Sequence, residues 1–253
     1  MREVVLLQKI YGRVSSMKFQ GFLEQLCEGL NVEFSGLSNE NEWIKTKISG
    51  EDATVAARFL EREVGLAPID VGNVTKFSTI RGRVKYSRLN KLQIWVDIGV
   101  LLPKPVYAVV TLQRLQGQLA DGAKYALKLI IDVFGLIEKF PLEVRVIKAE
   151  EEEFKAEITE RQLMLYRSWI NSHLDRLLIF GEFKERVEQA IKKANMTRDT
   201  VGLEPLGVLE HALICKLGTD AIGLVSRLGR RLPGTRLKAF SPRRILRLAH
   251  GRW

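Results

Sequence analysis

The stretch TIRGRVKYS, residues 79–87, alternates apolar and basic side chains, and KLQIWVDIG, residues 91–99, repeats this period of two. Such alternation predicts two β-strands, each with one buried face and one face turned away from the core. The face turned away carries Arg81, Arg83 and Lys85 in the first strand and Gln93, Trp95 and Asp97 in the second.

Three more strands complete a predicted barrel. PVYAVVTL, residues 105–112, is followed by a helical insert at 112–137 and then by PLEVRVIKA at 141–149 and EEFKAEIT at 152–159. A small closed barrel is built from five short strands, here with a glycine in the first strand and a helix between the third and fourth. We therefore expect a five-stranded barrel over residues 73–158.

This segment resembles the S1 type of oligonucleotide-binding barrel. Gly82-Arg83-Val84 matches the opening of the S1 pattern, Trp95–Gly99 its second strand, and Val144-Arg145-Val146 the start of its closing hairpin. Leu92 and Gln93 depart from it, because S1 barrels have an aromatic residue and a glycine there. The resemblance implies that single-stranded RNA stacks on exposed aromatic side chains, and Trp95 and Tyr107 are the candidates. The alternative is that Trp95 packs against a neighbouring domain.

Residues 1–72 have the pattern of a small β-α-β-β-α domain, half of a ferredoxin-like fold. Strands are expected at 4–10, 31–36 and 42–49, with a helix starting after Ser15 or Ser16 and another at 51–64. GLAPIDVGN, residues 65–73, is a predicted linker because glycine and proline interrupt the periodic segments.

Residues 159–253 predict a C-terminal α/β domain. A helix capped by Thr159 is expected to run to Leu177, and a second helix covers 184–193. Two strands flank Pro205, a helix opens at Asp220, and a last strand precedes a basic helix that starts at Pro242. The whole chain is therefore predicted to be α+β, with three domains at 1–72, 73–158 and 159–253.

Positive charge is concentrated in two blocks. The formal net charge is +10; residues 73–150 contribute +7, and residues 221–253 contribute +9 with no acidic residue among them. Segregated positive charge is typical of proteins that bind polyanions. The predicted phosphate contacts are Arg81, Arg83, Lys85, Arg88 and Lys91 in the barrel and Arg227, Arg230, Arg231, Arg236, Lys238, Arg243, Arg244 and Arg247 near the C-terminus. The alternatives are a solvated basic surface, or a basic helix packed on acidic parts of the same chain.

Catalytic and metal-binding motifs are missing from the sequence. No Walker loop, G-x-S-x-G, H-E-x-x-H or dinucleotide fingerprint occurs, so neither an enzyme nor a cofactor is expected. His211 and Cys215 share a strand face, which favours burial in the core over a zinc site. Two cysteines, no long apolar run and an N-terminus without a signal-peptide pattern predict a cytoplasmic protein that does not span a membrane.

Four short stretches carry a resemblance over the whole chain. They are LADG at 119–122, LGVLEH at 206–211, CKLGTDA at 215–221 and FSPRR at 240–244. The chain resembles an archaeal family of unknown function, domain of unknown function 2110. This resemblance implies an archaeal, cytoplasmic context and supplies no mechanism.

The predicted function is RNA binding, in translation or RNA processing, with ribosomal RNA as one candidate partner. The alternative is a protein-interaction module that docks on a ribosomal or transcription complex and uses Trp95 as an interface anchor.

Overall fold

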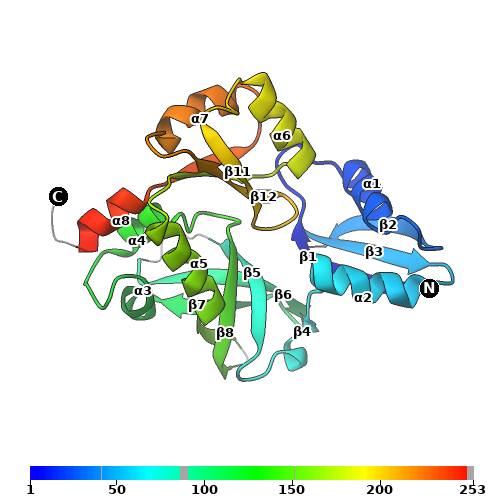
Figure 1. Ribbon diagram of the computed structural model, residues 1–253. Helices are drawn as coiled ribbons and strands as arrows, with labels where there is room; N and C mark the ends of the chain where they lie inside the picture. Colours follow the sequence, from blue (N-terminus) through cyan, green and yellow to red (C-terminus); the bar gives the residue numbers. More distant parts are fainter. Residues whose placement is uncertain (41, 86–90, 151, 250–253) are drawn as a thin grey trace.

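The computed structural model describes residues 1–253 except 41, 86–90, 151 and 250–253. Figure 1 shows three sheets: an N-terminal sheet at the right, a barrel below and a C-terminal sheet above. The first strand of the N-terminal sheet and the first strand of the barrel both lie near the centre. The packing of these two strands buries some of the side chains that the barrel strands turn away from the barrel core.

The N-terminal domain has the predicted β-α-β-β-α order. Its elements are β1 (Arg2–Lys9), α1 (Ser16–Leu26), β2 (Glu33–Glu40), β3 (Trp43–Ser49) and α2 (Ala53–Glu63). The sheet order is β1-β3-β2 with antiparallel neighbours. As expected, Ser15 caps α1: its hydroxyl accepts a hydrogen bond from the Lys18 amide at 3.3 Å.

The segment predicted as a linker contributes strand pairings. It contains β4 (Ile69–Asp70) and a 3-10 turn, η1 (Val71–Asn73). Leu66 forms an antiparallel bridge with Leu6 of β1, and Ile69 pairs with Val100 of the barrel. The connection between the first two domains is therefore tied to both sheets.

The central region is a closed five-stranded barrel with a helical insert, as predicted. Its strands are β5 (Thr79–Lys85), β6 (Gln93–Leu102), β7 (Val106–Thr111), β8 (Pro141–Ala149) and β9 (Phe154–Ile158). The pairings run β5–β6–β7–β9–β8 and return to β5, with β7 and β9 parallel. Helices α3 (Leu112–Leu119) and α4 (Leu127–Phe134) lie between β7 and β8 in the chain.

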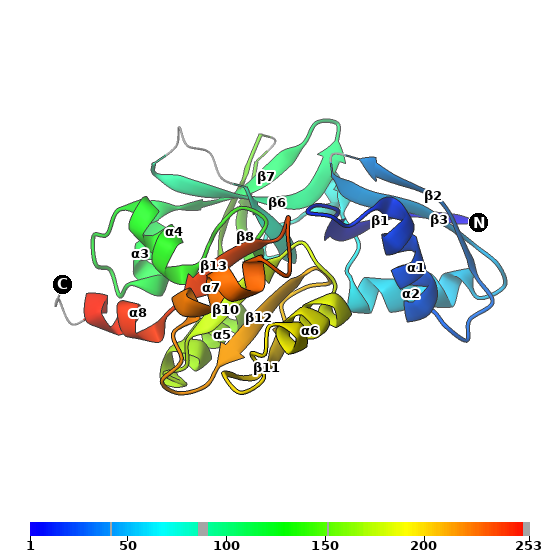
Figure 2. The ribbon, with the colours of Figure 1, turned by 90° about the horizontal axis from the view of Figure 1, so that it is seen from above.

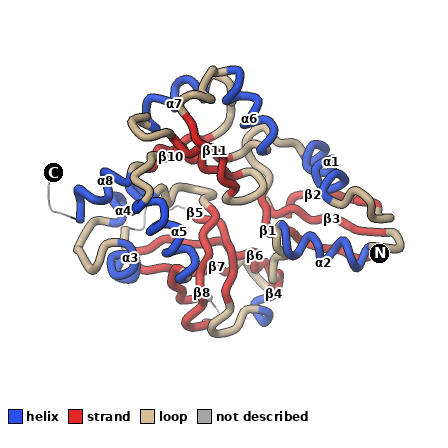
Figure 3. The backbone as a smooth tube through the Cα atoms, viewed as in Figure 1, coloured by secondary structure: helices blue, strands red, loops and turns tan. Residues whose placement is uncertain are grey.

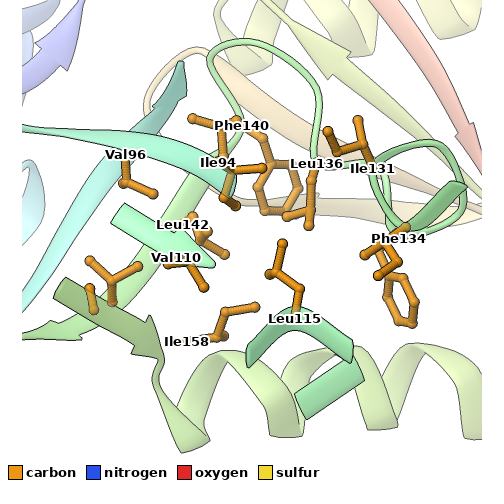
Figure 4. Close-up of a cluster of buried hydrophobic side chains, with 14 of the residues drawn as sticks. Ile94, Val96, Val110, Leu115, Ile131, Phe134, Leu136, Phe140, Leu142 and Ile158 are labelled. Atoms are coloured by element: carbon orange, nitrogen blue, oxygen red, sulfur yellow. The ribbon is translucent and has the colours of Figure 1, made fainter. Parts of the chain in front are cut away.

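Apolar side chains from the strands and the insert fill the barrel. Figure 4 shows Val96, Val110 and Leu142 from three strands converging with Leu115 of α3, and all four are fully buried. Gly82 is needed where β5 crosses β6, because a Cβ there would lie 2.5 Å from the Asp97 carbonyl oxygen. The glycine that the sequence places in the first strand therefore permits close strand approach.

The C-terminal domain completes a β-α-β-β-α-β arrangement. It contains α5 (Glu160–Asn171), β10 (Arg176–Phe180), α6 (Lys184–Lys193), β11 (Thr200–Pro205), β12 (Glu210–Cys215), α7 (Ala221–Gly229), β13 (Arg236–Phe240) and α8 (Pro242–Ala249). The antiparallel sheet has the order β11-β12-β10-β13. No helix in the described part of the chain is long and apolar enough to cross a membrane.

Strand β10 corrects the prediction of a helix running to Leu177. The helix ends at Asn171, and RLLIF forms a strand between β12 and β13. One face of β10, with Leu177, packs with α6 and α7, and the other face, with Phe180, packs with α5 and the barrel. Figure 3 shows α5 below this sheet and α6 and α7 above it. A strand buried on both faces has no alternation, so periodicity cannot distinguish it from a helix.

The N-terminal and C-terminal domains share one topology. The order β1-β3-β2 in the first matches β10-β12-β11 in the second, with helices at the corresponding connections. The C-terminal sheet adds β13 beside β10, whereas the Leu6–Leu66 bridge occupies the equivalent edge of the N-terminal sheet. Both domains are thus variants of the ferredoxin-like arrangement, one of them with its fourth strand reduced to a bridge.

Candidate nucleic-acid interface

The three basic residues of β5 lie in three different environments. Arg81 and Lys85 are exposed, whereas Arg83, between them on the same face, is 3% exposed. The alternation therefore predicts the face correctly, but the N-terminal and C-terminal domains cover its middle.

Arg83 lies in a buried polar cluster that joins all three domains. Its Nη2 donates to the Gln8 side-chain oxygen at 2.6 Å and lies 3.1 Å from Oε2 of Glu210, which is fully buried. Gln8 and Tyr11 also donate to the Glu210 carboxylate. Arg83 therefore has almost no exposed surface for the RNA contact that the sequence predicts, because its guanidinium lies beside Glu210 between the barrel and the C-terminal sheet.

A second ion pair lies beside the first. Asp97, which pairs with Arg83 in the β5–β6 register, accepts from Lys9 Nζ at 2.6 Å and from Trp43 Nε1 at 3.2 Å. The Lys9 and Asp97 side chains are only 5% and 9% exposed. We call residues Gln8, Lys9, Arg83, Asp97 and Glu210 the junction cluster.

The exposed end of the same face carries a lysine and two aromatic residues. Lys85 lies opposite Trp95, and Asp97 lies opposite Tyr107 on the next strand, so all of them face away from the barrel core. Lys85 Nζ donates to the Tyr107 hydroxyl at 2.7 Å and lies 4.4 Å from the ring centroid. Trp95 and Tyr107 are partly exposed. We call Lys85, Trp95 and Tyr107 the barrel patch (Figure 2 shows β6 and β7, which carry its aromatic residues).

Lys91 and Leu92 immediately precede β6, the strand that carries Trp95. Lys91 is exposed, and Leu92 is 70% exposed. Arg88 lies outside the described residues. Glu150 and Glu152 of the β8–β9 turn pair with Lys148, Lys155 and Lys104, so lysines neutralise both carboxylates.

Three of the predicted C-terminal contacts are bound within the chain. Arg227 pairs with Asp199 at 2.7 Å and donates to backbone carbonyls at the end of α6. Lys238 and Arg244 both pair with Asp132 of α4. These residues anchor the C-terminal elements to the rest of the protein, as the alternative of intramolecular packing predicts.

The remaining C-terminal arginines are exposed and fall into two groups. Arg230, Arg231 and Arg236 lie at the end of α7 and the start of β13, whereas Arg243 and Arg247 lie on α8. Arg243 and Arg247 line a polar cavity of about 190 Å³ together with His173 and Lys216. Figure 1 places α8 at the far side of the molecule from β1, next to α4.

The first group is linked to the barrel patch. Arg236 donates to the Glu138 carbonyl at 3.4 Å, and Glu138, Lys139 and Lys85 line one small cavity. Arg13 of the β1–α1 loop packs close to Gly234, where a Cβ would lie 2.9 Å from Arg13 Cγ. Sequence reasoning missed Arg13, because it is a lone basic residue in a loop and only the tertiary fold brings it here. Lys139 is also brought here, but it pairs with Glu42 and its side chain is only 15% exposed.

His211 is buried at 1% exposure, consistent with its expected place in the core. Its Nε2 lies 2.9 Å from the Glu182 carbonyl, and burial lowers the pKa of His211 below its ordinary value. Burial likewise raises the pKa of Cys215 to about 12, which makes its thiol unreactive at neutral pH. Within the described residues, no cluster of histidine, cysteine and carboxylate side chains could hold a metal ion.

Comparisons with known proteins match three consecutive parts of the chain. The DUF2110 N-terminal domain matches residues 3–68, the DUF2110 central domain residues 74–170, and the DUF2110 C-terminal domain residues 174–240. No curated protein matches the chain. A crystal structure of a Thermus thermophilus protein aligns at 13% identity and a TM-score of 0.17, over 99% of this chain and 43% of the other. The chain spans less than half of that protein, and such a low TM-score carries no structural argument.

Proposed function

This chain belongs to the DUF2110 family, and we propose that it binds single-stranded RNA on the barrel patch. The observation that carries the proposal is the arrangement of Lys85, Trp95 and Tyr107: two partly exposed rings and an ammonium group on one outer face of a closed barrel. Aromatic side chains on such a face stack bases irrespective of sequence, and each base contributes about 1–3 kcal/mol.

Phosphate contacts are assigned to the basic residues that remain exposed around the patch. Lys85 and Lys91 lie at the barrel, and Arg236 lies toward the C-terminal sheet. Lys139 is left out because it pairs with Glu42 and its side chain is only 15% exposed. Arg83 is excluded because Glu210 neutralises it. From the patch the RNA runs toward Arg236, with the exposed Arg230, Arg231 and Arg13 beyond it.

The finer parts of the proposal rest on the sequence. We assign the barrel to the S1 type and place the protein in an archaeal cytoplasm, acting in translation or RNA processing. Trp95 at the second aromatic position of the S1 pattern supports the assignment, whereas Leu92 in place of the first aromatic predicts fewer stacked bases than in a typical S1 barrel.

A protein partner is the second candidate. Leu92 is 70% exposed beside the partly exposed Trp95, and an apolar pair of this kind can anchor a protein interface. In that case the basic residues around the patch meet an acidic protein surface on a ribosomal or transcription complex.

Fluorescence anisotropy with a labelled single-stranded RNA tests the proposal on the full chain over a salt series. We expect submicromolar binding at about 200 mM salt. Trp95→Ala should weaken it by roughly 5- to 150-fold, the loss of one stacked base. Phe77→Ala is the matched control, because Phe77 is 62% exposed with Lys76 over its ring but precedes β5 at the end opposite Lys85.

Binding that disappears at this salt concentration, or that Trp95→Ala leaves unchanged, would contradict RNA stacking on the patch. A pull-down that loses a specific protein partner on Trp95→Ala would then favour the docking module. The test uses point variants and no C-terminal truncation, because a truncation would remove β13, which is paired with β10 inside the C-terminal sheet.

A further inference from the structure

A groove of about 430 Å³ lies between the barrel, α5 and the end of β11, away from the barrel patch. Half of its lining residues are apolar, among them Phe140, Met164 and Leu206. Arg81, Arg161 and Gln162 supply donor groups to it. Ligand sites of this size typically combine apolar walls with a few placed polar groups.

Two donors in the groove have no acceptor. The Arg81 side chain makes no hydrogen bond or ion pair with any residue that the structure describes, although it lies opposite Glu143 in the β5–β8 register. Partial burial and the neighbouring charge of Arg83 lower the pKa of Arg81, whereas the charge of Glu143 opposes this shift. Gln162 is only 8% exposed, and its Nε2 has no partner among the described residues.

The side chain of Gln162 does not complete a capping box with Thr159. Thr159 caps α5 by accepting from the Gln162 amide at 3.3 Å, but the Gln162 side-chain oxygen turns toward the Glu143 amide at 3.5 Å. Its NH2 group therefore stays in the groove wall. An unpaired buried donor costs about 1–3 kcal/mol, so its retention calls for an acceptor.

The carboxylates of the groove already have donors. Glu143 accepts from the Thr159 hydroxyl at 2.7 Å and lies 3.6 Å from Arg161. Glu204 accepts from Trp169 Nε1 at 3.1 Å and lies 3.8 Å from Arg176. Arg81 and Gln162 therefore offer donors that no described residue accepts from, and an anion matches the charge of Arg81.

We propose that this groove binds a small phosphorylated molecule of mononucleotide size. Its phosphate accepts hydrogen bonds from Arg81 and Gln162, with Arg161 at the rim, and its apolar or aromatic body lies against Phe140, Met164 and Leu206. Phosphate suits several convergent donors because it presents three acceptor oxygens, and guanidinium binds it in a bidentate manner. This site is independent of the proposed RNA-binding patch.

Isothermal titration of the full chain with AMP tests the proposal, with adenosine and inorganic phosphate as separate arms. We expect AMP to saturate one site, adenosine to bind weakly and phosphate to compete with AMP. Arg81→Gln and Gln162→Met should each weaken AMP by roughly 10- to 150-fold, the loss of a hydrogen bond to a charged group. Arg145→Gln is the matched control, because Arg145 lies two residues from Glu143 on β8 but pairs with Glu157 outside the groove.

A second readout separates ligand loss from misfolding. Without ligand, Arg81→Gln should leave the midpoint of thermal unfolding close to the wild-type value, because the Arg81 side chain is exposed. Failure of AMP to bind, or equal affinity in Arg81→Gln and the wild type, would overturn the proposal; so would a lowered midpoint, which would mean that the guanidinium is already stabilised in the free protein. Trp95→Ala should leave AMP binding intact, so the RNA proposal can fail without affecting this one.

Discussion

Arg83 and Lys85 are two residues apart on the same face of one strand, yet one is buried and the other is exposed. Arg83 is 3% exposed and paired with Glu210 of the C-terminal sheet, whereas Lys85 is exposed and donates to Tyr107 of the neighbouring strand. Strand period decides the face of a side chain, and the packing of other domains decides whether that face is an interface within the chain or a surface for a partner.

Because Arg83 is buried and Lys85 is exposed, substitutions at the two positions should affect different properties of the protein. A buried ion pair contributes little over an apolar pair, but removing one partner leaves an uncompensated charge in the interior. An exposed lysine is nearly neutral for stability. Changes in the junction cluster should therefore alter stability, and changes in the barrel patch should alter RNA binding.

The largest effect is expected for Arg83→Met. This change leaves the fully buried Glu210 carboxylate without its cation, so the free energy of unfolding should fall by about 3–5 kcal/mol. Urea denaturation measures the loss. Lys85→Met is the control and should lower stability by less than about 1 kcal/mol. Equal losses in the two variants would mean that the junction cluster and the barrel patch do not differ as described.

Acid should lower stability through His211, which follows Glu210 of the junction cluster in β12. Burial depresses its pKa in the folded state, so below about pH 6.5 the unfolded chain takes up a proton that the folded chain does not. Stability from this group is present above that pH and falls by up to about 1.4 kcal/mol per pH unit as the pH decreases toward the folded pKa. Urea denaturation of His211→Gln should give a shallower acid dependence; parallel curves for both proteins would argue against a buried neutral histidine.

In the barrel patch, Lys85→Gln should reduce the salt dependence of RNA binding, because it removes one positive charge. One phosphate contact to single-stranded RNA contributes about 0.7 to the slope of log affinity against log salt concentration, so the slope should decrease by that amount. Anisotropy titrations over a salt series give the value. Lys184→Gln on α6, which removes an exposed lysine paired with Glu188, should leave the slope unchanged. An identical slope for wild type and Lys85→Gln would remove Lys85 from the interface.

The smallest effect is expected for Tyr107→Phe. The ring remains available for stacking, but the hydroxyl that accepts from Lys85 at 2.7 Å is lost. RNA affinity should fall by about 0.5–1.5 kcal/mol, the net value of one hydrogen bond, while Tyr107→Ala should lose more because it also removes the ring. If both variants lose the same affinity, the ring does not stack a base.

Local patterns in the sequence were sufficient for most elements of the fold. Alternation identified the barrel strands, and the helix caps at Ser15, Thr159 and Asp220 accept the expected amide hydrogen bonds. The barrel closure followed from the number and order of strands. Strand β10 was missed because it is buried on both sides and so lacks a period.

The candidate site was less predictable, because exposure depends on contacts between segments far apart in the sequence. Nothing local distinguishes Arg83 from Lys85, since the partners of Arg83 lie 75 residues earlier and in a strand near the C-terminus. Likewise, no local pattern in the sequence distinguishes Arg227 from Arg236. Arg227 pairs with Asp199, which follows α6, whereas Arg236 lies near the barrel patch.

Photo-crosslinking of the full chain to a single-stranded RNA that contains 4-thiouridine, mapped by mass spectrometry, tests RNA binding on the barrel patch most directly. We predict crosslinks at Trp95 and Tyr107, weaker ones toward Arg236, and none at Arg83, which is 3% exposed. Crosslinks confined to α8 with its Arg243 and Arg247, or no crosslink under conditions where RNA is bound, would contradict the assignment of the RNA site to the barrel.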